Sequence, residues 1–417
     1  MLAAFELPAF RWYWVGQLLS GIGTWSQSIA LAWLVLDLTH SPVDLGTITM
    51  LQFLPILAFS LLGGVVADRF ARRQLLIVTQ IALTMEAVIL GVLVSTHVVT
   101  LWEVALIAVA VGTTNALNNP VQQAFVPELV GRELVADAVA LNSVQFNAAR
   151  MLGGAVGGVV IAEWGIGAAL FLNAASFVPI VVVLVLIRPV DQLERQAQRH
   201  VSALLELRQG LSYALATTSV RRVVILFAVI GLFGFNWQVA VPLVARFVLH
   251  RRVAGFGDLM AALGAGSLIG ALVMVRDQRA SELRLIVGGM ALGLSLMALG
   301  LSRSYPVSLV VLAVAGTGGV IASITANTRL QLLTPNHLRG RVMGIYVLLM
   351  GGTTPIGSFL LGEVAGHYGT GAAIVTFGVI TAGGVGLISA RRRRGAADLE
   401  SVPGAATRRI RDDNALE

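Results

Sequence analysis

The chain has 417 residues, of which 56% are hydrophobic and 12% charged, and its mean hydropathy is +0.83. Ordinary soluble domains contain about 25% charged residues, so this composition excludes a water-soluble enzyme or binding domain and predicts a membrane protein. The formal net charge is +7 and all 29 basic residues are arginines; because cytoplasmic loops of membrane proteins are rich in basic residues, we assign this excess to such loops and expect no nucleic-acid partner.

Apolar runs separated by turn or charge signals divide the chain into twelve candidate membrane spans. Each run is close to the ~20 residues that a helix needs to cross a bilayer. A spanning segment must satisfy its own backbone hydrogen bonds in lipid, so each run is expected to be an α-helix. The predicted fold class is therefore an all-α membrane protein with twelve transmembrane helices. The predicted spans are 12–37, 46–67, 75–96, 101–119, 138–162, 166–187, 222–248, 256–275, 284–302, 307–328, 342–363 and 370–390.

The loop between the second and third spans orients the chain. It reads GGVVADRFARR (63–73) and carries Arg69, Arg72 and Arg73, which predicts a cytoplasmic loop. An even number of spans then places both termini in the cytoplasm of a multi-pass protein of the inner or plasma membrane. The first residues show no cleavable signal pattern, so the first span is expected to be retained.

A polar segment near the middle of the chain predicts two halves. We expect an N-terminal six-helix half (1–187), a cytoplasmic linker (188–221), a C-terminal six-helix half (222–390) and a disordered cytoplasmic tail (391–417). Within the linker, 201–215 has helical apolar spacing and predicts a helix on the membrane surface.

The two halves also repeat at a nearly constant shift. Asp68 recurs 209 residues later as Asp277, and three residues of the fourth span and its end recur 208 residues later. A constant shift over separate regions predicts two pseudo-symmetric halves related by an axis along the membrane normal. The three pairs at the shift of 208 are Asn119 and Asn327, Gln123 and Gln331, and Pro127 and Pro335.

These residues resemble the major facilitator superfamily. Gly64-x-x-x-Asp68-Arg69-x-x-Arg72-Arg73 is similar to the loop motif of that superfamily, and 14–42 and 119–158 resemble the drug and siderophore exporters that include the enterobactin exporter. The resemblance implies a secondary active transporter that exports hydrophobic or amphipathic small molecules by alternating access, driven by a proton gradient. Two departures bear on proton antiport: 104–119 contains no arginine, and Gly154-Ala155 stands where Gly-Pro is usual.

The resemblance also implies a gate built on the loop motif. Asp68 lies where a span ends and is expected to accept hydrogen bonds from a helix N-terminus, whose dipole favours an anion. By resemblance that helix is the eleventh span, so Asp68 and Arg69 would latch the two halves on the cytoplasmic side. Gly64 would let the helices pack closely there. For Arg72 and Arg73 the alternative is that they only anchor the topology.

Arg150 lies near the middle of the fifth span, where a charge costs about 2.5–3.5 kcal/mol on insertion scales. It is expected either to face a central cavity and attract an anionic group or to bind carbonyls of an adjacent helix. The other polar residues at cavity depth are either substrate contacts or helix–helix hydrogen bonds. The predicted cavity residues are Gln27, Asn115, Gln145, Asn147, Arg150, Asn236, Gln238, Asn327 and Thr353.

Glu86 is the one acidic residue near mid-depth, in the third span. A carboxyl in lipid is protonated unless it is paired. Glu86 is therefore either a proton-coupling residue or a buried, neutral, hydrogen-bonded carboxyl.

Two alternative hypotheses for the function remain: a lysophospholipid or metabolite carrier, and a non-transporting membrane sensor or scaffold. An enzyme is not expected, because the chain has no cysteine, no phosphate-binding P-loop and no histidine pair at metal-binding spacing. The glycine-rich runs 153–158 and 264–270 lie inside spans and predict packing surfaces. We expect no cofactor and no metal; the expected partners are a small-molecule substrate, the proton gradient and membrane lipid, with one chain as the functional unit.

Overall fold

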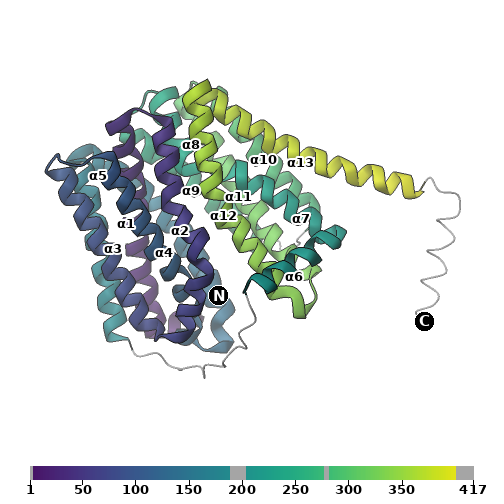
Figure 1. Cartoon of the computed structure of the whole chain (residues 1–417), viewed down its shortest axis with the longest axis horizontal. Helices are drawn as coiled ribbons and strands as arrows, with labels where there is room; N and C mark the ends of the chain where they lie inside the picture. The colour runs from purple at the N-terminus through teal and green to yellow at the C-terminus, as the bar shows by residue number, and fades with distance from the viewer. Residues whose placement is uncertain (1–2, 188–202, 277–280, 401–417) are drawn as a thin grey trace.

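The computed structural model describes residues 3–187, 203–276 and 281–400, and within them it leaves the side chains of 60–69, 132, 136, 203–207, 276, 336–337 and 391–400 undescribed. All regular structure in these ranges is helical, and the helices form two bundles side by side (Figure 1). The N-terminal half contains η1 (Ala3–Glu6), α1 (Pro8–Thr39), α2 (Pro42–Arg69), α3 (Arg72–Ser95), α4 (Leu101–Val130), η2 (Arg132–Leu134) and α5 (Val135–Leu186). The linker contains α6 (Ala203–Ala216), and the C-terminal half contains α7 (Thr218–Val229), η3 (Ile230–Gly234), α8 (Trp237–Leu243), η4 (Val244–Val248), α9 (Val253–Arg276), α10 (Glu282–Leu301), α11 (Tyr305–Leu333), α12 (Asn336–Tyr368) and α13 (Thr370–Glu400).

Eleven helical segments of the described chain are long and apolar enough to cross a membrane. The longest, α5, has 52 residues, or about 78 Å at 1.5 Å per residue, more than twice the thickness of a bilayer core. It is interrupted at Gly165, whose φ of 83° and ψ of 174° are not helical. The predicted spans 138–162 and 166–187 are the two arms of α5 on either side of this glycine. The count of twelve stays a prediction that treats these arms as separate crossings.

The predicted span 222–248 is not one regular helix. It consists of α7, the π-helical stretch η3, α8 and the π-helical stretch η4. Phe235 (ψ 24°) and Asn236 (ψ 42°) leave the helical conformation between η3 and α8. Pro242 has no N–H to donate to the carbonyl of Gln238, four residues earlier, which weakens the helix at this level. π-Helical stretches occur frequently at functional sites.

The linker and tail differ from the simplest expectation. Helix α6 covers most of the predicted surface helix 201–215, and it packs against the end of the C-terminal half: Tyr213 Oη donates to the Leu333 carbonyl at 3.3 Å. Helix α13 runs ten residues past the predicted span end at 390, so the predicted disordered tail is helical as far as Glu400. Arginine, alanine and glutamate favour helix, which explains the extension. Residues 188–202 and 401–417 lie outside the described residues.

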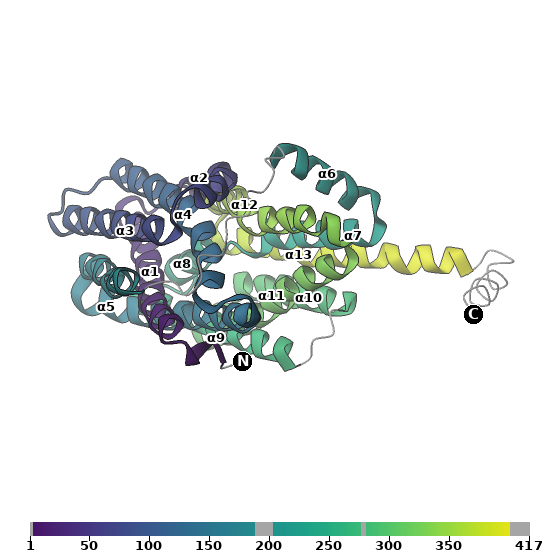
Figure 2. The same ribbon diagram turned by 90° about the horizontal axis from the view of Figure 1, so that it is seen from below.

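The halves meet through two pairs of helices, α5 with α9 and α2 with α12 (Figure 2). We call the end of the bundle where α1 begins the N face and the opposite end the far face. A methyl group on Gly257 would lie 2.8 Å from the Cα of Gly158, and one on Gly46 would lie 2.9 Å from the Cα of Gly362. Only glycine permits such close backbone contact. Both contacts lie toward the far face, so the halves close against each other there, and the run 153–158 is a packing surface as predicted.

An ion pair joins the halves at the far face. Arg246 Nη1 donates to Asp37 Oδ1, and the Arg246 guanidinium lies 5.2 Å from the ring centre of Trp33. Asp37 and Arg246 are 209 residues apart, which is the shift of the internal repeat. Equivalent positions of two halves related by a two-fold axis touch each other only next to that axis. The pair therefore lies at the pseudo-symmetry axis and closes the far face at its centre.

Candidate functional site

A cavity of about 800 Å³ lies between the two halves. Its walls come from α1, α2, α4 and α5 on one side and from α8, α9, α11 and α12 on the other. The last turns of α4 (Gln123, Pro127) and the first turn of α5 (Val135) belong to the lining. These turns are at the N face, so the cavity opens toward the N face while the glycine contacts and the ion pair close the far face.

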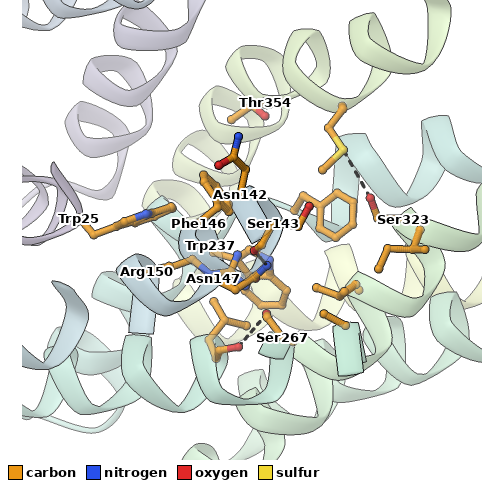
Figure 3. A pocket seen from close by; sticks show the side chains of 18 of the residues that line it. Trp25, Asn142, Ser143, Phe146, Asn147, Arg150, Trp237, Ser267, Ser323 and Thr354 are labelled. Carbon is orange, nitrogen blue, oxygen red and sulfur yellow. Dashed lines mark hydrogen bonds between the residues drawn. The ribbon is translucent and has the colours of Figure 1, made fainter. Parts of the chain in front are cut away.

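Arg150 projects into this cavity beside Asn147 (Figure 3). Among the described residues that line the cavity, it is the single charged one. Its Nη2 is 3.4 Å from Asn147 Oδ1, its guanidinium lies 5.9 Å from the ring centre of Trp25, and its buried Nε has no hydrogen-bond partner among the described residues. A buried cation with unused donors in an otherwise uncharged cavity attracts an anionic ligand group.

The break in the seventh predicted span supplies the opposite wall. Asn236, Trp237 and Gln238 line the cavity at the point where the helix is interrupted. Asn236 Nδ2 donates to the Leu232 carbonyl at 2.7 Å, and Ser358 Oγ approaches Asn236 Oδ1 at 3.5 Å. The buried Oε1 of Gln238 finds no hydrogen-bond partner in the part of the chain that the structure describes. This wall thus offers both aromatic surface and hydrogen-bonding groups.

Three predicted cavity residues line a different, smaller cavity of about 180 Å³ inside the N-terminal half: Gln27, Asn115 and Gln145. Asn173 Nδ2 donates to Gln27 Oε1 at 2.6 Å, and Gln145 Nε2 donates to the carbonyl of Gln17 at 2.8 Å. Of the predicted set, Asn147, Arg150, Asn236 and Gln238 line the central cavity. The sequence alone did not separate the two groups.

Two predicted cavity residues line neither cavity. Asn327 accepts a hydrogen bond from Gln331 Nε2 at 2.6 Å, and Thr353 Oγ1 donates to the Leu349 carbonyl at 2.7 Å. The next residue, Thr354, lines the central cavity instead. Successive side chains on a helix point in directions about 100° apart. The polar residue at the cavity wall is therefore one position after the predicted Thr353.

Glu86 lies outside the lining of both cavities, between α3 and α4. Thr114 Oγ1 donates to Glu86 Oε1 at 2.7 Å, and the buried Oε2 has no partner among the described residues. This arrangement suits a neutral carboxyl that joins two helices of one half.

Two arginines of the loop motif bind within their own half. Arg72 Nη1 pairs with Glu128 Oε1 at 2.8 Å and donates to the Ala124 carbonyl at 3.2 Å. Arg73 donates to the carbonyls of Leu184, at 2.5 Å, and Val185. Both therefore tie the start of α3 to α4 and to the end of α5. The side chains of Asp68 and Arg69, and the surroundings of Gly64, lie outside the described part of α2.

The central cavity also contains polar residues that the sequence did not single out as ligands. Most are serine, threonine or asparagine on helices that pack against each other. Such residues commonly form helix–helix hydrogen bonds in membranes, so their type alone carries no signal for a substrate wall. They are Gln123, Asn142, Ser143, Ser267, Ser323, Thr354 and Ser358.

Residues 1–406 match the major facilitator family described as transmembrane secretion effector. The chain belongs to this family. The staphyloferrin A transporter of Staphylococcus aureus is 23% identical over 89% of the chain and 93% of its own length, and the multidrug efflux pump Tap of Mycolicibacterium fortuitum is 28% identical over 86% and 89%. The enterobactin exporter EntS of Shigella boydii is 26% identical over 91% and 89%.

Solved transporter structures share the fold. A bacterial homologue of the human lysosomal transporter Spinster, inward-facing and unoccupied, matches with a TM-score of 0.71 at 13% identity, over 91% of the chain and 96% of that protein. A D-xylose–proton symporter matches with a TM-score of 0.70 at 14% identity, over 90% and 96%. The predicted superfamily, all-helical fold and membrane-transporter class are confirmed, and the chain belongs to a family of transporters rather than enzymes.

Proposed function

We propose that this chain exports hydrophobic or amphipathic small molecules of the drug or siderophore type by alternating access. The observation that carries the proposal is the 800 Å³ cavity between two pseudo-symmetric halves, open at one face and closed at the other. Such a volume is in the range of pockets that hold drug-sized ligands. The named relatives include siderophore and multidrug transporters, which supports the same substrate class.

The direction follows from the proposed topology. The N face holds the loop motif with Arg72 and Arg73 as well as α6 with Arg208, and a concentration of arginine supports a cytoplasmic face. The cavity would then load from the cytoplasm in the observed conformation. Release on the other side requires the α5–α9 and α2–α12 contacts to open and the N face to close, with Asp68 and Arg69 as its latch.

The cavity wall supports a more specific substrate. Trp25, Phe146 and Trp237 offer apolar surface, and Arg150 offers an unpaired positive charge. An amphipathic molecule with an anionic group meets both conditions. We further propose that an inward proton gradient drives the export; the hydrogen bond from Thr114 to Glu86 supports a structural role for that carboxyl rather than proton coupling.

The test is dye efflux from energised cells that express the wild type, Asp68→Asn or Arg150→Ala, with and without a protonophore. We expect wild-type efflux to stop with the protonophore and to be lost in both variants. Efflux that survives the protonophore would refute proton coupling alone. Wild-type cells that export no dye of any charge would refute export of drug-type molecules and leave a narrow substrate of the siderophore type.

A further inference from the structure

The smaller cavity inside the N-terminal half has an unusual lining that the transport cycle above does not use. Its walls come from α1, α2, α3, α4 and both arms of α5. Of the 21 residues in the described part of the chain that line it, ten are asparagine or glutamine, three are serine or threonine, and none is charged. Buried polar groups are unfavourable unless they are hydrogen-bonded, so this concentration of amides calls for an explanation. We call this cavity the amide pocket.

The amide pocket has hydrogen-bonding capacity that the protein itself does not use. Gln80 is 2% exposed, and its Nε2 donates to Asn118 Oδ1 at 3.3 Å. Its Oε1 is buried and has no hydrogen-bond partner among the described residues. The acceptor of Asn118 is already shared, because Thr79 Oγ1 also donates to it at 2.9 Å. Gln80 lines the pocket, and its Oε1 is an acceptor that no described protein group uses, so a rotation of the side chain would offer it to a donor of a bound molecule.

The amide pocket adjoins the central cavity. Trp25 and Phe146 line both cavities, and their rings meet edge to face with centres 5.8 Å apart. This aromatic pair is the shared wall, and the Arg150 guanidinium lies 5.9 Å from the centre of the Trp25 ring. Aromatic side chains at such a boundary pack against apolar parts of a ligand while neighbouring amides bind its polar part.

We propose that the amide pocket is a second substrate subsite, which binds the neutral hydroxyl- or amide-bearing head of an amphiphile whose apolar body lies in the central cavity. The proposal rests on the proposed export function and adds a polar subsite to it. Carboxamides both donate and accept hydrogen bonds, as hydroxyls and amides do. A pocket without charges disfavours an ionic head, because nothing compensates the loss of its hydration. A volume of about 180 Å³ suits a small head rather than a whole drug-sized molecule.

The experiment compares two neutral fluorescent probes with the same apolar body. They are the dansyl amide of butylamine and the dansyl amide of tris(hydroxymethyl)aminomethane, which replaces the alkyl tail by a head with three hydroxyls. Binding is measured by dansyl fluorescence to the full chain in lipid nanodiscs, with empty nanodiscs subtracted. We compare the wild type with Gln80→Met, which keeps the side-chain length and removes the free acceptor. The control is Gln74→Met, the same change at an exposed position of the same helix.

We expect the Gln80→Met variant to bind the trihydroxy probe about tenfold more weakly, the size of one lost hydrogen bond at the upper end of the usual range. Binding of the butyl probe should stay unchanged, and the thermal stability should change little, because Asn118 Oδ1 loses the 3.3 Å bond from Gln80 Nε2 but keeps the hydrogen bond from Thr79 Oγ1. Asn115→Leu, elsewhere on the pocket wall, should show the same selective loss. Gln74→Met should behave as the wild type.

Four results would overturn the subsite. The first is wild-type affinity for both probes in Gln80→Met and Asn115→Leu, and the second is an equal loss for both probes. The third is a wild type that binds the butyl probe but not the trihydroxy probe. In that case water occupies the amide pocket, and the proposed export function is unaffected. The fourth is a wild type that binds neither neutral probe; efflux of an anionic dye tests the export function separately.

Discussion

Replacement of Arg246 by glutamine should shift the protein away from the conformation described here. The Arg246–Asp37 pair joins the two halves only while the far face is closed, so its loss destabilises that conformation and leaves the open one unaffected. The Arg246 side chain is 18% exposed and that of Asp37 44%, and partly exposed ion pairs contribute about 0.2–1 kcal/mol. The contact of the guanidinium with Trp33, at 5.2 Å, adds about 0.5–1 kcal/mol. A total of about 1–2 kcal/mol changes the ratio of the two conformations by about 5- to 30-fold.

Because the chain contains no cysteine, two engineered cysteines can carry spin labels without background. Thr96→Cys at the end of α3 and Arg303→Cys after α10 place one label on each half at the exposed far face. Double electron–electron resonance then reports the far-face separation, with a long distance for the open state. We expect the ratio of long to short distances to rise about tenfold in Arg246→Gln.

Two further variants separate the ion pair from general damage. Arg251 lies 4.5 Å from the ring centre of Tyr305, within the C-terminal half, so Arg251→Gln should leave the distance distribution unchanged. The double variant Asp37→Arg with Arg246→Asp restores opposite charges and should recover part of the short-distance population. A wild-type distribution in Arg246→Gln would refute the reasoning that this pair holds the far face closed.

Three other changes test the gate, the cavity charge and the acid in the third span. In Gly257→Leu, the new side chain cannot fit against Gly158, where even a methyl group would lie 2.8 Å from the Cα. The long spin-label distance should dominate, and dye efflux should fall at least about tenfold. Normal efflux would show that the far face need not close. Arg150→Gln should weaken export of an anionic dye by about tenfold or more, because hydrogen bonds to charged groups contribute about 1.5–3 kcal/mol. Arg150→Lys should keep part of this export. An equal loss for anionic and neutral dyes would argue against an anion site. Glu86→Gln keeps an acceptor for the Thr114 hydroxyl, so folding and efflux should persist; loss of protonophore-sensitive efflux in this variant alone would instead identify Glu86 as the proton carrier.

Local properties of the sequence were sufficient to predict that the chain is a membrane protein and where most of its helices lie. The predicted span 75–96 corresponds to α3 (Arg72–Ser95), and 284–302 corresponds to α10 (Glu282–Leu301). Apolar length, the need to satisfy the backbone in lipid, and charges at the ends are written in consecutive residues. The loop motif and the segments 14–42 and 119–158 were likewise sufficient for the superfamily.

Side-chain direction required the tertiary structure. Thr353 donates a hydrogen bond to its own helix while Thr354 lines the cavity. When every face of a helix is apolar, its hydropathy pattern does not show which of two neighbouring residues faces the cavity. The break at Phe235 and Asn236 was also not apparent, because the run 222–248 is long enough to be a continuous helix. Polar membrane residues look alike in sequence whether they contact a neighbour, a cavity or a substrate.

The contacts between the two halves, more than any other feature, could be identified only from the tertiary structure. The sequence places Gln27, Asn115 and Gln145 in one group with Arg150, but packing divides them between the amide pocket and the central cavity. The repeat predicts that the two halves are related by an axis, yet only the folded chain brings Asp37 to Arg246 at that axis. Hydropathy and motifs describe what each helix needs from its solvent. Which helix it meets, with which face and in which conformation of the transporter, depends on the packing of segments far apart in the chain, 209 residues apart in the case of this pair.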